Sequence, residues 1–113
     1  ENDKFNYEVE KFNNLINTIP NMPELKCSEL NKEIECIDLK KAIAFKQFSN
    51  NYVSKFGNKK ITLDIVYPEC KDCNYTLYEK KSRNYKTLRK ISSPVSVFDN
   101  SYKIGKLNVE WYI

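Results

Sequence analysis

The spacing of apolar residues changes at Gly57, and this change most constrains what the chain can fold into. Before Gly57 the apolar residues recur every three or four positions, which is typical of helices with one buried face. After Gly57 they alternate with polar residues, which is typical of strands. Because helices come first and strands follow, the sequence predicts an α+β fold with helices packed on an antiparallel sheet of about four strands.

Two helices are predicted. The first runs from Asp3 to Ile19, where Pro20 ends it, and the second runs from Asp38, a suitable N-cap, to Phe56. Both carry an apolar stripe of aromatic and aliphatic residues. The large side chains expected to form the core are Phe5, Phe12, Phe45, Phe48 and Trp111.

The strands follow the second helix. A chain of 113 residues buries about 65% of its unfolded surface, which is enough for one core, so residues 1–113 are predicted to form a single domain. The alternation ends at Pro68 for the first strand. The predicted strands are 61–67, then 75–79 and 87–92 around a charged turn, and a terminal hairpin of 93–98 with 104–113.

Four cysteines allow three kinds of chemistry: structural disulfides, a zinc site, or a redox pair. Cys27 and Cys36 are separated by eight residues, and Cys70 and Cys73 by two. An even number of cysteines in a short chain favours disulfides, and disulfides persist in oxidising compartments. The local pairing is Cys27 with Cys36 and Cys70 with Cys73, although crossed pairings remain open.

The segment between the two helices has two interpretations. If Asn31 and Lys32 form a two-residue hairpin turn, Cys27 faces Cys36 in a non-hydrogen-bonded pair, close enough for a disulfide. If the segment is a helix, the two cysteines lie on opposite sides and roughly 13 Å apart along the axis, so no bond forms. We favour the hairpin.

Redox and zinc chemistry are less well supported. A strand leading into C-K-D-C, with Pro94 downstream, has the order of a thioredoxin site, but the 20 residues from Asn74 to Ser93 are too few for the helix, strand and helix that lie between in that fold. For zinc, the spacing of Cys27 and Cys36 is too wide for a knuckle, and the chain has no histidine. We therefore expect no bound metal or other cofactor.

Catalytic groups are also scarce. Without histidine there is no Ser-His or Cys-His dyad. Glu33 and Glu35 form a loose pair of carboxylates, which we interpret as exposed hairpin residues rather than an acid–base pair. The sequence thus predicts a protein that is not an enzyme and has no small-molecule substrate.

One segment, residues 79–90, is strongly basic. It has six bases, one acid and an interleaved Tyr85, and such a segment can contact the phosphates and stack the bases of a nucleic acid. The simpler interpretation is a solvated turn with lysines that protect an edge strand. The candidate contacts for an acidic polymer are Lys80, Lys81, Arg83, Lys86, Arg89 and Lys90.

The terminal segments S-P-V-S-V-F-D and G-K-L-N-V-E-W, with the more loosely matching E-C-I-D-L-K-K-A-I-A-F, resemble small archaeal exported proteins, including pilin-like ones. This resemblance implies an extracytoplasmic sheet domain behind an apolar N-terminal anchor helix. The chain starts at Glu1 without that anchor, so any membrane attachment would depend on a segment upstream. The implied role is structural or adhesive, with a protein partner or self-assembly at the cell surface.

Asn74-Tyr75-Thr76 also fits a glycosylation sequon.

Overall fold

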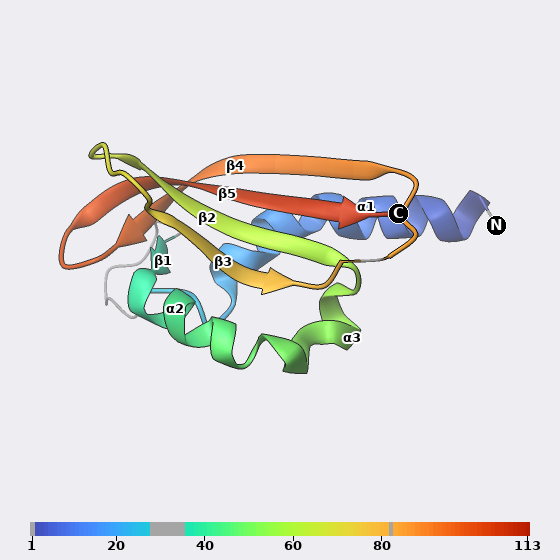
Figure 1. The fold of residues 1–113 in the computed structure, drawn as a ribbon, viewed down its shortest axis with the longest axis horizontal. Coiled ribbons are helices and arrows are strands. Elements are labelled where there is room, and N and C mark those ends of the chain that lie inside the picture. The colour runs from blue at the N-terminus through green and yellow to red at the C-terminus, as the bar shows by residue number, and fades with distance from the viewer. Residues whose placement is uncertain (1, 28–35, 82) are drawn as a thin grey trace.

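The architecture is taken from a computed structural model, which describes residues 2–27, 36–81 and 83–113 (Figure 1). Helices and strands alternate only in the first part of the chain, and strands follow one another in the second. The helices are α1 (Asn2–Thr18), α2 (Leu39–Gln47) and α3 (Val53–Phe56), with 3-10 turns η1 (Ile19–Asn21) and η2 (Ser49–Tyr52); the strands are β1 (Cys36–Asp38), β2 (Lys59–Tyr67), β3 (Asn74–Glu79), β4 (Leu88–Phe98) and β5 (Tyr102–Tyr112).

The strands form one sheet in the order β1-β4-β5-β2-β3. This confirms the α+β class but corrects two details, because the described sheet has five strands and is mixed. The additional strand, β1, pairs parallel to β4 from Cys36 to Asp38, while the other pairs are antiparallel. The predicted hairpin already placed Cys36 in an extended segment, but three residues are too few to indicate that this segment pairs with β4.

β3 and β4 are not neighbours, which corrects the expected strand pair around the basic turn. β3 pairs with β2 at one edge, and β4 pairs with β5 on the other side of β2. The connection of residues 80–87 therefore crosses the end of the sheet instead of closing a hairpin. The predicted terminal hairpin is confirmed, because β4 and β5 pair along their whole length from Leu88–Tyr112 to Phe98–Tyr102.

β4 runs uninterrupted through Pro94, although two separate strands, 87–92 and 93–98, were predicted here. Thr87 and Ile113 exchange backbone hydrogen bonds in both directions, so the odd-numbered residues of β4 direct their N–H groups at β5. Pro94 lies at an even position, where the backbone nitrogen points away from β5. The strand thus loses no hydrogen bond to β5 at its proline.

One face of the sheet is covered by helices. Ile61, Leu63, Leu107 and Val109 alternate along the two central strands on that face and are at most 1% exposed. α1 runs behind β4 and β5, whereas α2 and α3 lie alongside β3 (Figure 1). The opposite face carries mainly polar side chains and has no helix among the described residues.

The first helix is confirmed, but the second is shorter than predicted. Asp38 caps α2 as expected, accepting from the backbone N–H groups of Lys40 and Lys41 at 2.9 and 3.4 Å. α2 nevertheless ends at Gln47, and the chain continues through η2 into α3. Asn50 and Asn51 lie at this break, and asparagine disfavours a helix interior because its side chain competes for backbone hydrogen bonds.

The break changes which aromatic side chains are buried. Phe12 and Phe45 are buried, as predicted, and Trp111 is half-buried. Phe48 is 59% exposed and Phe5 is 44% exposed, so the prediction that these two belong to the core is wrong. Phe48 leaves the buried stripe because α2 ends just before it, and Phe5 lies near the N-terminal end of α1, beyond most of the sheet.

Candidate functional site

Cys27 and Cys36 form a buried disulfide with a Cα–Cα distance of 5.4 Å. The neighbouring Lys26–Ile37 bridge is antiparallel and has the register that the hairpin predicts. However, the Cys27 N–H donates to the Cys36 carbonyl at 2.9 Å, so the expectation of a non-hydrogen-bonded pair is wrong. The proposed turn at residues 31–32, like Glu33 and Glu35, lies outside the described residues.

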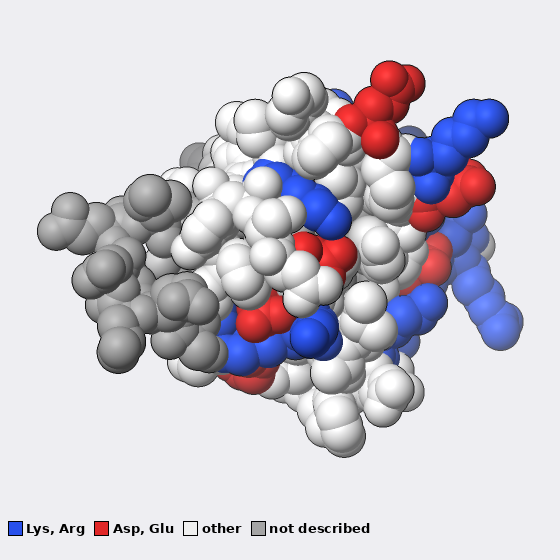
Figure 2. All heavy atoms as spheres, turned by 90° about the vertical axis from the view of Figure 1, so that its left-hand side faces the viewer, with Lys and Arg blue, Asp and Glu red and all other residues white. Residues whose placement is uncertain are grey.

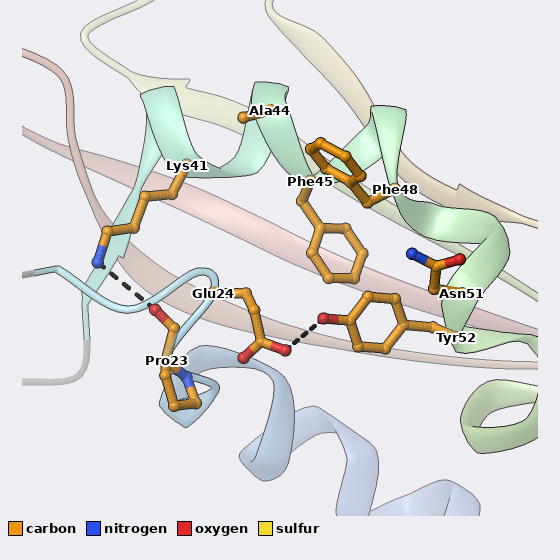
Figure 3. Close-up of a pocket in the computed structure, with 8 residues that line it drawn as sticks. All are labelled: Pro23, Glu24, Lys41, Ala44, Phe45, Phe48, Asn51 and Tyr52. Carbon is orange, nitrogen blue, oxygen red and sulfur yellow. Dashed lines mark hydrogen bonds between the residues drawn. The ribbon is translucent and has the colours of Figure 1, made fainter.

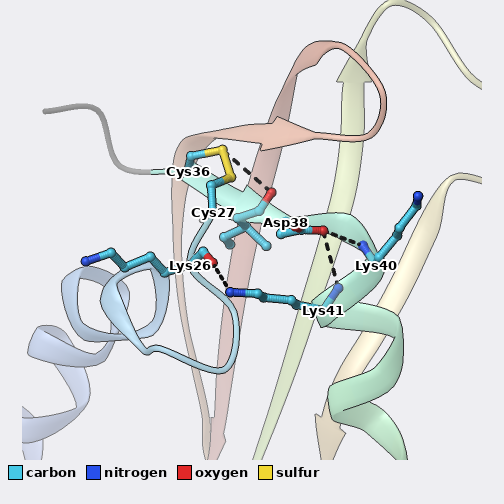
Figure 4. Close-up of a disulfide and its surroundings, with 7 residues drawn as sticks. Lys26, Cys27, Cys36, Asp38, Lys40 and Lys41 are labelled. Atoms are coloured by element: carbon cyan, nitrogen blue, oxygen red, sulfur yellow. Dashed lines mark hydrogen bonds between the residues drawn. A yellow bond between two sulfur atoms is a disulfide. The ribbon is translucent and has the colours of Figure 1, made fainter. Parts of the chain in front are cut away.

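Further bonds fasten this disulfide to the start of α2 (Figure 4). The Lys41 ammonium donates to the Lys26 carbonyl at 2.8 Å, and the Asp38 N–H donates to the Leu25 carbonyl at 2.8 Å. One disulfide and several hydrogen bonds thus hold the segment before Cys27 against β1 and α2. We infer a structural role for this sulfur pair.

Cys70 and Cys73 form the second disulfide, with a Cα–Cα distance of 5.7 Å, in the turn between β2 and β3. The Ile65 N–H donates to the Cys73 carbonyl at 2.9 Å, which ties the turn to β2. The predicted local pairing is thus confirmed for both disulfides. Catalytic CxxC pairs lie at helix N-termini, where the thiolate is stabilised, whereas a strand follows Cys73.

Both disulfides lie at the same end of the molecule. β1 pairs with the last residues of β4, next to the β4–β5 turn, and the Cys70–Cys73 turn follows the end of β2, which pairs with the start of β5. The N-terminal end of α1 lies at the opposite end (Figure 1). The covalent braces are therefore remote from the start of α1.

The disulfide-braced end carries a group of exposed apolar side chains, which we call the apolar tip. It consists of Val66, Tyr67, Tyr102 and Ile104, which are 52–66% exposed. A shallow hollow of about 270 Å³ adjoins it, with Val66, Pro94 and Ile104 in its lining. Figure 2 looks onto this end, where uncharged side chains form most of the described surface.

A row of polar side chains crosses the open face of the sheet beside the hollow. Ser92 donates to the Asn108 side-chain carbonyl at 2.7 Å, and the Asn108 amide donates to Thr62 at 3.3 Å and to Asp64 at 3.0 Å. Asn108 is only 5% exposed, although no described helix covers it. The row links β4, β5 and β2 through hydrogen bonds and makes this face polar.

A groove of about 510 Å³ lies between the segment after η1 and the break in the second helix (Figure 3). Ala44, Phe45 and Phe48 supply apolar lining, and the Tyr52 hydroxyl donates to the Glu24 carboxylate. This hydrogen bond lowers the pKa of Glu24 and raises the pKa of Tyr52. The lowered pKa favours the carboxylate form of Glu24. This form suits a structural hydrogen bond between the segment after η1 and Tyr52 better than it suits proton transfer.

The six predicted polyanion contacts lie close together at the end where α1 begins. Lys80, Lys81, Arg83 and Lys86 belong to the connection of residues 80–87, and Arg89 and Lys90 start β4; all six are exposed. The ring of Tyr85 lies 5.5 Å from the Lys81 ammonium and 5.0 Å from the ring of Tyr112.

α1 is attached to the sheet at this end through an aromatic contact. The ring of Phe12 lies 5.2 Å from the ring of Trp111. The ring of Phe5 is stacked on the ring of Trp111, with 6.5 Å between the ring centres. The Arg89 guanidinium lies 5.6 Å from the Phe5 ring. One of the predicted polyanion contacts therefore also holds α1.

Sequence reasoning missed Lys59, a lysine that is only 6% exposed. Its ammonium donates to the Phe56 carbonyl at 2.5 Å, at the end of α3, and lies 5.4 Å from the Trp111 ring. Burial lowers the pKa of Lys59, while nearby Glu8 raises it. The alternation of Ile61 and Leu63 would have revealed its inward position, had the strand been extended by one more pair of residues.

Comparison with known proteins adds no relative. No protein-family model, curated protein or solved structure matches the chain. Within residues 2–27, 36–81 and 83–113, no three acidic, cysteine or histidine side chains cluster as metal ligands would. In the same ranges, each helix is too short or too polar to cross a bilayer.

Proposed function

We propose that the protein is a non-enzymatic extracytoplasmic domain with a structural or adhesive role, tethered or assembled through its N-terminal side. The observation that carries the proposal is the pairing of Cys27–Cys36 and Cys70–Cys73 at one end of the molecule. Paired cysteines are consistent with an oxidising environment, since cytosolic thiols are normally kept reduced.

The apolar tip is the best candidate for an adhesive contact. It lies beside both disulfides and away from the start of α1, so a domain held by its N-terminal side would present it outward. Exposed aromatic and aliphatic side chains that gather in one place favour contact with another protein, which would be a protein partner or a second copy of this chain.

The first experiment counts thiols in protein purified from its native source without reductant. Alkylation followed by intact-mass measurement should label no cysteine before reduction and four after it. Intact cells should in addition expose the protein to a membrane-impermeant amine-reactive label. Free thiols together with protection from the label would refute the extracytoplasmic proposal.

The second candidate function is a small basic nucleic-acid-binding module with reduced or zinc-bound cysteines. The exposed bases of residues 80–90 and the Lys81–Tyr85 contact favour it. The pairing of all four cysteines counts against its reduced or zinc-bound form. Affinity for single-stranded DNA that falls steeply with salt would support this alternative.

The resemblance to small archaeal exported, pilin-like proteins stays a prediction. The described residues of the segments that suggested it lie mainly in β4, β5, β1 and α2, so they belong to the sheet and to one covering helix. The reading frame upstream of Glu1 tests it directly. About 20 consecutive apolar residues there would supply the expected anchor, and a polar or absent upstream segment would remove the pilin-like assignment.

A further inference from the structure

We propose that the end of the molecule where α1 begins docks on the surface of an anionic lipid bilayer. We call this surface the basic end and define it by Lys80, Lys81, Arg83, Lys86 and Lys90 together with the exposed apolar side chains of Phe5, Tyr85, Leu88 and Ile113. The inference goes beyond the proposed function, and its lipid contact does not depend on the presence of a tether.

Within the described residues, no lysine or arginine of the basic end forms an ion pair. The described residues contain two ion pairs, Lys60–Glu79 at 3.9 Å and Lys103–Asp99 at 3.1 Å. Neither pair includes a lysine or arginine of the basic end. Five exposed cations on a short stretch of chain produce a local positive potential. Such a surface is attracted to anionic head groups over about one Debye length.

Apolar side chains are interleaved with these charges. Leu88 is 45% exposed, Phe5 44%, Tyr85 37% and Ile113 36%. Surfaces that bind at the bilayer interface combine both features, because the cations contact head groups while aromatic and aliphatic groups enter the boundary with the acyl chains. A purely solvated turn would not require the apolar side chains.

The hydrogen bonds of the connection hold the cations and the apolar groups together. The N–H groups of Lys86 and Thr87 donate to the Ile113 carbonyl at 2.8 and 3.2 Å, which joins the connection to the end of β5. Through the contact of Arg89 with Phe5, the same surface continues onto α1. The basic end is therefore a prearranged surface rather than a flexible basic tail.

The same details favour a bilayer over a nucleic acid. Binding of single strands relies on aromatic rings that are free to stack on bases. Tyr85, the aromatic residue of the connection, already packs on Tyr112 and lies beside Lys81. Leu88 and Ile113 are aliphatic and offer no ring to a base, whereas they suit the acyl boundary.

The position of α1 gives the docked molecule an orientation. α1 begins at the basic end and runs toward the body of the sheet, and the apolar tip lies at the far end (Figure 1). Docking through the basic end would therefore direct the apolar tip away from the bilayer. This arrangement agrees with a domain held at its N-terminal side.

The test measures partitioning of the disulfide-intact protein onto sedimented vesicles. The vesicles contain phosphatidylcholine alone or phosphatidylcholine with phosphatidylglycerol. We expect binding to the anionic vesicles that weakens with added salt, and little binding to phosphatidylcholine alone. Each cation near the surface changes the partition coefficient roughly fivefold, so Lys81→Ala with Arg83→Ala should lower it on the order of 20-fold.

The matched control removes two exposed lysines elsewhere, Lys71→Ala with Lys106→Ala, which changes the net charge equally. We expect this control to bind within about threefold of the unsubstituted protein, because its lysines lie more than a Debye length from the docked bilayer. Circular dichroism verifies that both variants are folded.

Equal loss in the two variants would overturn the proposal, since it would mean that net charge alone drives binding. Tighter binding of single-stranded DNA than of anionic vesicles at the same salt concentration would also overturn it, in favour of a nucleic acid. Thiol counting is a separate measurement, so a failure of lipid docking and a failure of the extracytoplasmic proposal give different results.

Discussion

Gly105 lies on the inner face of β5, where neighbouring strands leave no room for a side chain. A methyl group placed there would lie 2.6 Å from Val97 Cγ2 and 3.0 Å from the Asp64 carbonyl oxygen. Val97 is fully buried, so it cannot move aside easily. We expect Gly105→Ala to lower the free energy of unfolding by about 1–3 kcal/mol, as overpacking of a core does, measured by urea denaturation.

A double-mutant cycle tests the cause of this loss. Val97→Ala removes the closer of the two clashing groups and should by itself destabilise the protein by leaving a cavity. Combined with Gly105→Ala, it should cost less than the sum of the two single changes, because the added methyl group fills the space. Additive costs would show that the clash with Val97 is not responsible.

Lys59 gives the stability a specific dependence on pH. Burial lowers the pKa of its ammonium below the ordinary 10.5, so between these two values the unfolded state binds more protons than the folded state. The contribution of Lys59 to the free energy of unfolding therefore rises with pH in the alkaline range. It is lowest below the lowered pKa, where the ammonium is charged in both the folded and the unfolded state.

Comparison with Lys59→Met isolates this effect. Tyr78 and Tyr112 have raised pKa values and so oppose it, since they destabilise the folded state as pH rises, but both proteins contain them. We expect the free energy of unfolding of the unsubstituted protein, minus that of Lys59→Met, to increase from neutral to mildly alkaline buffer. A difference that stays constant would mean that the pKa of Lys59 is not shifted by folding, and a difference that falls would mean that folding raises it.

At the scale of elements, the two disulfides brace very different surroundings. The cysteines of the Cys27–Cys36 disulfide have a sequence separation of 9, and both are buried. Those of the Cys70–Cys73 disulfide have a sequence separation of 3, and Cys70 is exposed. Loop-closure entropy alone gives about 3 kcal/mol for the first and about 2 kcal/mol for the second. Alanines at Cys27 and Cys36 would also leave a cavity between β1 and the segment before it.

We therefore expect Cys27→Ala with Cys36→Ala to destabilise the protein more than Cys70→Ala with Cys73→Ala. Urea denaturation of both double variants, compared with the oxidised unsubstituted protein, measures the two costs. A larger cost for the Cys70 pair would show that the exposed turn, and not the buried bridge, is the more important brace.

Elements with a long and regular pattern could be predicted from the sequence, and those set by tertiary contacts could not. The period of α1 and the alternation of β2 indicated both elements, and the spacing of Cys27 and Cys36 indicated their bridge. The parallel pairing of β1 with β4 could not be predicted, because three residues show no period and the partner lies about 60 residues away. Phe48 was misplaced because the stripe continues past the point where asparagines end the helix.

The candidate surfaces show the same difference between features that are local in the sequence and features that depend on tertiary contacts. The bases of residues 80–90 were evident as a run of charge, and their exposure agrees with that interpretation. The apolar tip could not be found, since its members come from β2 and β5, and only the pairing of Tyr67 with Ile104 brings them together. Lys59 was missed because the predicted strand began at residue 61, although the same alternation places Lys59 on the inner face.

At the scale of the whole molecule, the described residues form an elongated body with extents of 46 × 29 × 24 Å. The covalent braces and the apolar tip lie at one end, and the basic end with the start of α1 at the other. The hydrophobic core between them is continuous: it includes Phe12 of α1, Phe45 of α2 and Leu107 of β5. Helices and sheet therefore stabilise each other rather than forming separate units.

A continuous core implies that α1 and the sheet unfold together. Trp111, the single tryptophan, lies between them with Phe12 5.2 Å away, so its fluorescence reports the docking of α1. Far-ultraviolet circular dichroism reports all helices and strands. We expect the two signals to give coincident urea transitions with a free energy of unfolding of about 5–15 kcal/mol, as for one cooperative domain.

The variant Phe12→Ala is a stricter test of cooperative unfolding, because it weakens the packing of α1 on the sheet and leaves both disulfides intact. The loss of a buried phenylalanine should lower the free energy of unfolding by about 3–5 kcal/mol. If the core is cooperative, both signals shift to lower urea by the same amount, since α1 cannot leave while the sheet stays folded. A fluorescence transition that precedes the circular dichroism transition would instead show that α1 detaches first and that the sheet, held by its disulfides, is stable alone.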